Sequence, residues 1–117
     1  MNDLSSKKCI LCEGDVKPFT KSQAESYLPL VPGWQLADDA KSISRKFKFK
    51  NFAQAMAFVN SVGEIAEAEG HHPDISFGWG YASITSLTHA IAGLSENDFI
   101  LAAKINKLIP ERAHGLP

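Results

Sequence analysis

Apolar residues recur at helical spacing over the middle of the chain. They are Phe52, Ala55, Met56, Val59, Val62, Gly63 and Ala66. Asn51 precedes this stripe as a good N-cap, Gly70 suits the left-handed position past a helix end, and Pro73 prevents continuation. The pattern therefore predicts a long helix between Asn51 and Gly70, with one face packed on a sheet.

An alternating pattern predicts the strands of that sheet. Residues 43–49 alternate between two faces, and one face holds Ile43, Phe47 and Phe49 together with Arg45. Serine and lysine occupy the other face, which is typical of an antiparallel sheet covered on one side. Residues 33–36 can begin an extended segment. Residues 74–79 and 82–89 read as a hairpin around Gly80-Tyr81.

Two further helices are predicted by their caps. Thr20 and Gln23 have the form of a capping box for a short helix to about Leu28. Ser95 is an N-cap with Asp98 in the reciprocal position, and Leu94 and Phe99 can form a hydrophobic staple. The buried face of this last helix is expected to include Ala102, Ala103 and Ile105, and its end is expected at Leu108-Ile109 before Pro110.

The order of these elements predicts an α+β fold. We expect a single-layer antiparallel sheet of about four strands with helices packed on one face, whose edges could pair with another subunit. The predicted organisation is an N-terminal arm at 1–19 that carries a Cys-x-x-Cys, one domain at 20–110, and a loose tail at 111–117 that makes His114 an unlikely site residue.

The composition and net charge of the chain limit the kinds of molecule that it is expected to bind. The chain has 117 residues, enough for one domain, with 44% hydrophobic and 21% charged residues and a formal net charge of -1. This balance argues against nucleic acid or an anionic membrane as the main partner and favours a small substrate. No run is long enough for a membrane span, and the polar segment from Met1 to Lys8 does not resemble a signal peptide, so we expect a cytoplasmic protein.

The strongest candidate chemistry is a group of histidines. His71 and His72 follow the predicted helix end, and His89 ends the predicted hairpin, whose return brings it back toward them. Neutral imidazoles accept or donate protons near pH 7, so the group could perform acid/base catalysis without a cofactor. His72 precedes Pro73 and is therefore biased toward an extended conformation.

Two other interpretations of these histidines remain open. A metal could be bound with oxygen from Asp74 or Asp98, although neighbouring residues in an extended segment point to opposite sides and would not easily share one ion. The histidines could also cap carbonyl groups near the helix end. Asp98 is explained by its capping box alone, but it could in addition face a histidine and orient its ring.

Other candidates have ordinary structural explanations. Trp34 and Trp79 are more often core residues than ligand-stacking residues, and Glu67 fits a solvated helix face. Cys9 and Cys12 supply half of a tetrahedral zinc site, and glycine and proline after them indicate a loop. Reduced thiols on an arm explain them most simply, while a metal shared with a histidine or another subunit, or redox chemistry, are the alternatives.

The joint spacing of these residues resembles the signature of the pterin-4a-carbinolamine dehydratases. The matching positions are Glu67, His71-His72-Pro73, Trp79, Thr88-His89, Gly93-Leu94-Ser95 and Asp98. The resemblance extends over about Trp34 to Ile105. It implies dehydration of 4a-hydroxytetrahydrobiopterin to quinonoid dihydrobiopterin, which recycles the pterin of aromatic amino acid hydroxylases, with no metal or organic cofactor.

The resemblance also implies roles for individual residues. His71, His72 and His89 would surround the 4a-hydroxyl and N5 of the pterin, with His71 and His89 as the first choices for proton transfer and Asp98 orienting a histidine. The other residues expected to bind the substrate are Trp34, Glu67, Pro73, Thr88, Ala90 and Ile91. A homodimer or homotetramer and coupling to a hydroxylase are expected. Relatives that serve as binding, coactivator or assembly proteins define the alternative function, and the Cys9-x-x-Cys12 arm hints at an extra interaction.

Overall fold

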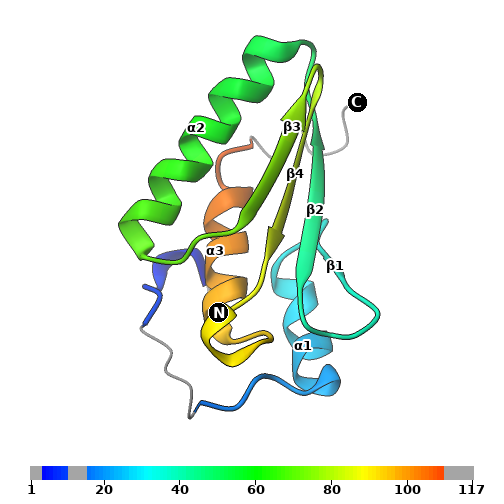
Figure 1. Cartoon of the computed structure of the whole chain (residues 1–117), viewed down its shortest axis with the longest axis vertical. Coiled ribbons are helices and arrows are strands. Elements are labelled where there is room, and N and C mark those ends of the chain that lie inside the picture. The colour runs from blue at the N-terminus through cyan, green and yellow to red at the C-terminus, as the bar shows by residue number, and fades with distance from the viewer. Residues whose placement is uncertain (1–3, 11–15, 110–117) are drawn as a thin grey trace.

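The computed structural model describes residues 4–10 and 16–109 and shows an antiparallel sheet with helices on one face (Figure 1). Its helices are α1 (Lys21–Tyr27), α2 (Phe52–Glu69) and α3 (Glu96–Asn106), with 3-10 turns η1 (Leu4–Ser6), η2 (Leu28–Leu30) and η3 (His89–Ile91). The strands are β1 (Gln35–Leu36), β2 (Ile43–Lys48), β3 (Asp74–Gly78) and β4 (Tyr81–Ser86). The predicted α+β class is confirmed.

The sheet has the order β1-β2-β4-β3, and every neighbouring pair is antiparallel. On β2 the Ile43 and Phe47 side chains are buried beneath the helices, whereas Lys46 and Lys48 are exposed on the open face. The predicted one-sided covering is therefore confirmed. In this order β3 is an edge strand, and its first three residues are exposed.

Helix α2 begins and ends where its sequence predicts. The Gln54 backbone N–H donates to the Asn51 side chain at 2.8 Å, and Gly70 has a φ of 65°, in the left-handed region. The predicted apolar stripe needs a correction at its first turns, because Phe52 and Met56 are 45% and 43% exposed. The Phe52 ring packs on Phe77 of the edge strand β3, with their centroids 5.5 Å apart, where the small sheet ends.

The hairpin and the segment after it differ from the prediction. The turn lies at Trp79-Gly80, one residue earlier than expected, because Gly80 takes the positive φ of 82° that the tight turn requires. Strand β4 ends at Ser86, so His89 is not on a strand but begins η3. Thr88 causes this change by pairing with Gly93, with its N–H donating to the Gly93 carbonyl at 2.7 Å.

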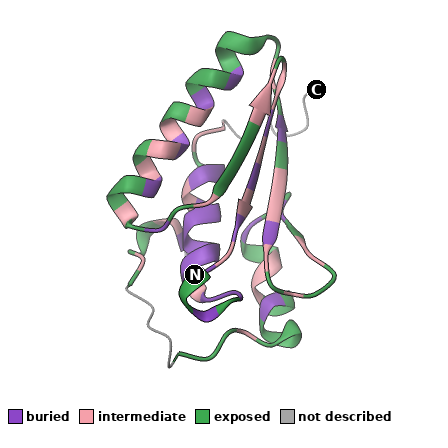
Figure 2. Ribbon diagram, viewed as in Figure 1, coloured by how far each residue is buried: buried purple, intermediate pink, exposed green. Residues whose placement is uncertain are grey.

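Helix α3 is the centre of the molecule, and almost all of it is buried (Figure 2). Ser95 caps it and its N–H donates to the Asp98 carboxylate at 3.0 Å, as the capping box predicts. The predicted buried positions Ala102, Ala103 and Ile105 are confirmed. The helix ends at Asn106, earlier than the expected Leu108-Ile109, and a turn follows.

Residues 4–10 of the predicted N-terminal arm are packed against this core. Turn η1 lies on α3, and the Leu4 side chain is buried. Cys12, the tail at 111–117 and His114 lie outside the described residues, and the domain boundaries at 19 and 110 stay predictions. Within the described ranges, no helix combines the length and the apolar character that a membrane crossing needs.

Candidate active site

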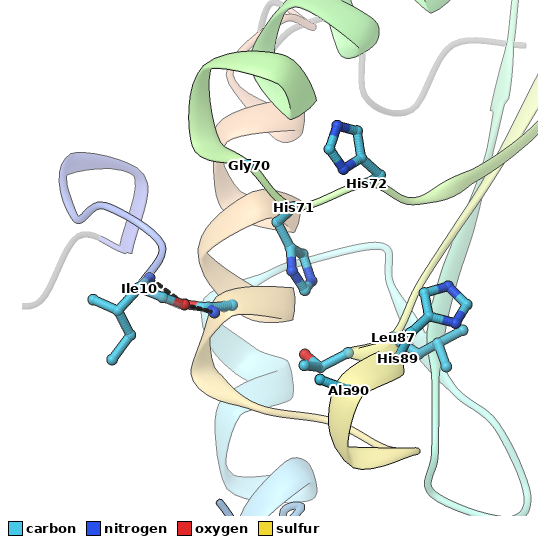
Figure 3. Close-up of a pocket in the computed structure, with 9 residues that line it drawn as sticks. Ile10, Gly70, His71, His72, Leu87, His89 and Ala90 are labelled. Atoms are coloured by element: carbon cyan, nitrogen blue, oxygen red, sulfur yellow. Dashed lines mark hydrogen bonds between the residues drawn. The ribbon is translucent and has the colours of Figure 1, made fainter. Parts of the chain in front are cut away.

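A cavity of about 230 Å³ lies between the end of α2, the start of α3 and the segment that contains η3 (Figure 3). It is lined by Ile10, Gly70, His71, His72, Leu87, Thr88, His89, Ala90 and Asn97. The three histidines singled out in the sequence therefore lie on one cavity. The β3–β4 hairpin and the Thr88–Gly93 pairing bring them together, because they return the chain from the end of α2 to the start of α3.

The end of α2 sends the two adjacent histidines in opposite directions. Gly70 terminates the helix, and the His71 N–H donates to the Ala66 carbonyl at 3.2 Å. The His71 ring is buried and points toward the η3 segment, whereas the His72 ring is exposed and points away from it (Figure 3). The expectation that neighbours in an extended segment diverge is confirmed.

A fully buried carboxylate holds the His71 ring. His71 Nε2 lies 2.7 Å from Asp98 Oδ1, and the Ser86 hydroxyl donates to the same oxygen at 2.6 Å. The other oxygen, Oδ2, accepts from the Thr88 hydroxyl at 2.7 Å and from the Ser95 N–H at 3.0 Å. Four contacts to two oxygens are the pattern of an ionised carboxylate, which only accepts.

The two ring nitrogens of His71 have different hydrogen-bonding roles. With Nε2–H donating to Asp98, the neutral ring carries its only proton on Nε2, so Nδ1 is free of hydrogen and can accept a proton. The tautomer follows from the acceptor character of the carboxylate. The Asp98 carboxylate thus orients the imidazole of His71 through this hydrogen bond, and it also caps the start of α3.

The exposed neighbour, His72, has its own carboxylate partner. His72 Nε2 lies 2.6 Å from Glu67 Oε2, and both side chains face solvent. Glu67 is on the last turn of α2, as the solvated helix face of the sequence analysis required. His72 lines the cavity, whereas Glu67 does not.

His89 approaches the cavity from η3 and is exposed. No hydrogen bond to its ring is formed by any of the described residues, in contrast to the ring of His71. The chain can present His89 there because Ala92 adopts a left-handed φ of 53° that closes the turn. His71 and His89 therefore offer a fixed imidazole and a solvated imidazole to the same cavity.

Some predicted substrate-binding residues lie on the cavity and others do not. Thr88 and Ala90 line it beside His89, whereas Pro73 and Ile91 do not. Trp34 is buried in the core, where its Nε1–H donates to Asn106 Oδ1 at 2.9 Å and its ring packs edge-on against Phe47. The structure therefore places Trp34 where the simple core interpretation of the sequence placed it.

The structure also adds residues that the sequence analysis did not select. Ser86 could have been found, because it lies two residues before Thr88 and side chains two apart in a strand share a face. Ile10 and Asn97 had no such signal, since their contact joins positions far apart in the chain. Among the described residues, no group of three or more histidine, cysteine, aspartate or glutamate side chains is placed to hold a metal ion.

Comparison with known proteins identifies the family. The model of the family described as pterin 4 alpha carbinolamine dehydratase matches residues 17–108. A relative from Halorhodospira halophila that is named after this dehydratase is 55% identical over 90% of this chain and 96% of its own length. One from Aromatoleum aromaticum with the same name is 51% identical over 93% of this chain and 97% of its own.

Solved structures agree with this family. The crystal structure of a transcriptional coactivator/pterin dehydratase from Brucella melitensis superposes with a TM-score of 0.75 at 32% identity, and the match covers 80% of this chain and 100% of that one. A pterin dehydratase-like protein identified as a RuBisCO assembly factor in the alpha-carboxysome superposes with a TM-score of 0.57 at 28% identity, over 65% and 88%. The chain belongs to the pterin 4 alpha carbinolamine dehydratase family.

Proposed function

We propose that this protein dehydrates 4a-hydroxytetrahydrobiopterin to quinonoid dihydrobiopterin and water, and thereby recycles the pterin of an aromatic amino acid hydroxylase. The observation that carries the proposal is the convergence of His71, His72 and His89 on one cavity, with His71 bonded to the buried Asp98. Membership of the dehydratase family supports the same reaction.

The reaction needs two proton movements. The C4a–O bond breaks and its electron pair leaves with the hydroxyl, which takes up one proton and departs as water. N5 loses one proton, and its electron pair forms the C4a=N5 double bond. One group must therefore donate a proton and another must accept one, and a positioned side chain of this kind contributes about 10² to 10⁴ in rate.

We assign these two proton movements to His71 and His89. The free Nδ1 of His71 is fixed by the Asp98 bond on Nε2, so it needs little reorganisation to accept or return a proton. His89 is exposed and can exchange its proton with solvent between turnovers. His72, which is paired with Glu67, and Thr88 and Ala90 along the cavity wall complete the proposed contacts to the pterin.

The test is a dehydration assay coupled to phenylalanine hydroxylase, which follows loss of the carbinolamine signal. The wild-type protein should accelerate that loss, and His71→Ala and His89→Ala should each lower kcat by about 10²-fold or more. Full activity in both variants, or no acceleration by the wild-type protein, would contradict the proposal. Which of the two histidines is the acid follows from comparing the pH dependence of kcat in the two variants.

We further propose that the protein forms a homodimer or homotetramer. The edge strand β3 is exposed at Asp74, Ile75 and Ser76, so its outer backbone groups are available for a second copy. Exposed apolar side chains lie nearby at Phe52 and Met56 on α2. Light scattering should give a mass of two or four chains, and a monomer at micromolar concentration would contradict this proposal.

A second candidate function is assembly or coactivation without catalysis. It is favoured by the structural likeness to a protein identified as a RuBisCO assembly factor and to one described as a transcriptional coactivator. Such a role would use the outer surface, so it would survive His71→Ala and His89→Ala together. The two functions are separated if that double variant loses dehydration but keeps a binding partner of the wild-type protein.

A further inference from the structure

The N-terminal residues 4–10 contact the candidate active site although they lie outside the stretch that the family model matches, which begins at residue 17. Their turn η1 packs on α3 and buries Leu4, and the chain then passes the end of α2 (Figure 1). Ile10, at the end of this segment, lines the cavity with the histidines. We name residues 4–10 the strap.

The strap is bound to the start of α3 through Asn97. The Ile10 N–H donates to Asn97 Oδ1 at 2.9 Å, and Asn97 Nδ2 donates back to the Ile10 carbonyl. One side-chain amide thus pairs with both backbone groups of Ile10, as a neighbouring strand would. Asn97 is buried and directly precedes Asp98, the partner of His71.

The strap is bound to the end of α2 through Glu69. The Cys9 N–H donates to Glu69 Oε1 at 2.9 Å, and Glu69 lies two residues before His71 in the chain. Lys104 completes this contact, because its Nζ lies 3.5 Å from Glu69 Oε2 and donates to the Ser5 carbonyl at 2.9 Å. The strap therefore joins the two segments that carry His71 and Asp98.

The position of Ile10 indicates what the strap does for the cavity. Its side chain is 74% exposed and points away from His71 and His89 (Figure 3). The strap consequently contributes backbone and the paired Asn97 amide to the wall, rather than an apolar side chain. Such a wall shields one side of a bound molecule from water and holds the end of α2 against α3.

We infer that the strap is part of the pterin site and retains the substrate there, an inference that rests on the proposed dehydratase function. Release of the strap should weaken pterin binding while the His71–Asp98 contact, which the strap does not make, remains. KM should therefore rise more than kcat falls. Ile10 and Asn97 are positioning residues in this scheme, because the proposal gives their side chains no proton to move.

Cys9 provides a measurement of strap docking that does not depend on activity. Its thiol is half-buried and donates to the Asn97 carbonyl at 3.5 Å. Burial is the main cause that raises the pKa of the Cys9 thiol from 9.0 to about 12. Because the thiolate is the reactive form, alkylation near pH 8 should be slow when the strap is docked and fast when it is released.

The experiment compares Ile10→Pro with Ile10→Ala, both in a Cys12→Ser background that leaves one thiol. Proline removes the N–H that donates to Asn97, and alanine keeps it, while both remove the exposed side chain. Ile10→Pro should raise the rate of Cys9 alkylation by iodoacetamide about fivefold relative to Ile10→Ala. It should raise the Kd for 7,8-dihydrobiopterin, a stable isomer of the proposed product, by a similar factor.

A reciprocal effect gives the strongest test. If docking of the strap favours pterin binding, saturating dihydrobiopterin must favour docking by the same factor and slow Cys9 alkylation in the Cys12→Ser protein. A purely structural strap would not respond to the ligand.

Three results would overturn the inference, and they are distinguishable. Faster alkylation of Ile10→Pro with a Kd within about twofold of Ile10→Ala would separate the strap from the site and leave the proposed function intact. Unchanged alkylation in Ile10→Pro would show that the Asn97 pairing does not hold the strap. A wild-type protein that neither binds dihydrobiopterin nor dehydrates the carbinolamine would overturn the proposed function together with the inference.

Discussion

Two histidine–carboxylate pairs lie at the end of α2, and they have nearly equal lengths in opposite surroundings. His71 Nε2 and Asp98 Oδ1 are 2.7 Å apart, and the two side chains are 10% and 0% exposed. His72 Nε2 and Glu67 Oε2 are 2.6 Å apart, and the two side chains are 61% and 79% exposed. Asp98 also accepts from Ser86, Thr88 and Ser95, whereas the Glu67 pair is open to water.

The difference teaches that burial and additional partners, more than distance, decide what such a pair can do. An exposed pair gains about 0 to 1 kcal/mol, because water screens the charges and both side chains must be held in place. A buried carboxylate with all its acceptor sites used is rigid, and loss of one partner leaves desolvated groups unpaired. We therefore expect His71 to be fixed for proton transfer and His72 to adapt to the substrate.

The largest expected effect comes from Asp98→Asn, which keeps the shape of the side chain. One oxygen becomes an NH₂ group, so either the Ser95 N–H meets another donor or His71 must move its proton to Nδ1. The free energy of unfolding in urea should fall by at least about 3 kcal/mol, because several hydrogen bonds to a charged group, each worth about 1.5 to 3 kcal/mol, are weakened together. A loss below about 1 kcal/mol would place this buried pair in the same class as the exposed one.

Removing a single donor to Asp98 should have a smaller effect. Ser86→Ala deletes the buried hydroxyl 2.6 Å from Oδ1 and should lower the free energy of unfolding by about 1.5 to 3 kcal/mol, the range for a hydrogen bond to a charged group. Ser83→Ala is the matched control, because Ser83 lies on the same strand but on the open face. Its stability should stay within about 0.5 kcal/mol of the wild-type value.

A third carboxylate, that of Glu69, lies between Asp98 and Glu67 in exposure to solvent and makes the docking of the strap depend on pH. The Cys9 N–H, and then Lys104, hold the pKa of Glu69 below its ordinary value of 4.5. The stabilisation that the ionised Glu69 carboxylate gives the strap is therefore complete above pH 4.5. It is lost as the pH falls through the lower pKa that Glu69 has in the folded state. In the Cys12→Ser protein, the rate at which 4,4′-dithiodipyridine modifies Cys9, divided by that of an unfolded reference peptide, should be higher at about pH 3 than at about pH 6.

The control for this acid effect is Glu69→Gln, which keeps an oxygen for the Cys9 N–H but does not titrate in this range. Its Cys9 modification rate, divided by that of an unfolded reference peptide, should show no step between the two pH values. An equal step in Glu69→Gln would mean that another group releases the strap.

The smallest expected effect is that of Glu67→Gln on stability. Both members of its pair are exposed, so the free energy of unfolding should change by less than about 1 kcal/mol, and high salt should reduce even that change. Urea unfolding at low and high salt measures it. A loss comparable to that of Asp98→Asn would contradict the distinction between the two pairs.

Much of the site follows from local sequence signals. Gly70 and Pro73 predict the end of α2, and Ser95 with Asp98 predicts the start of α3, because caps act within a few residues. These two ends place His71 and Asp98 correctly on their own elements. The bond between them is a tertiary contact, so the sequence could only allow it and not establish it.

The errors have a common physical origin in long-range packing. His89 was expected on a strand, but the pairing of Thr88 with Gly93 ends β4 early and forms η3. Phe52 was expected to pack on the sheet as part of the apolar stripe, but it lies against the edge strand and is 45% exposed. The strap belongs to the predicted N-terminal arm, and nothing in its own composition reveals its contacts with Glu69 and Asn97.

The most direct test of the central claim is the ratio of kcat in His71→Ala and His72→Ala, measured with saturating carbinolamine in the coupled assay. If the buried pair carries proton transfer, His71→Ala should lower kcat by about 10² to 10⁴ and His72→Ala by at least about tenfold less. A loss of kcat in His72→Ala as large as that in His71→Ala would contradict the account, since it would show that the anchorage by Asp98 confers no special role.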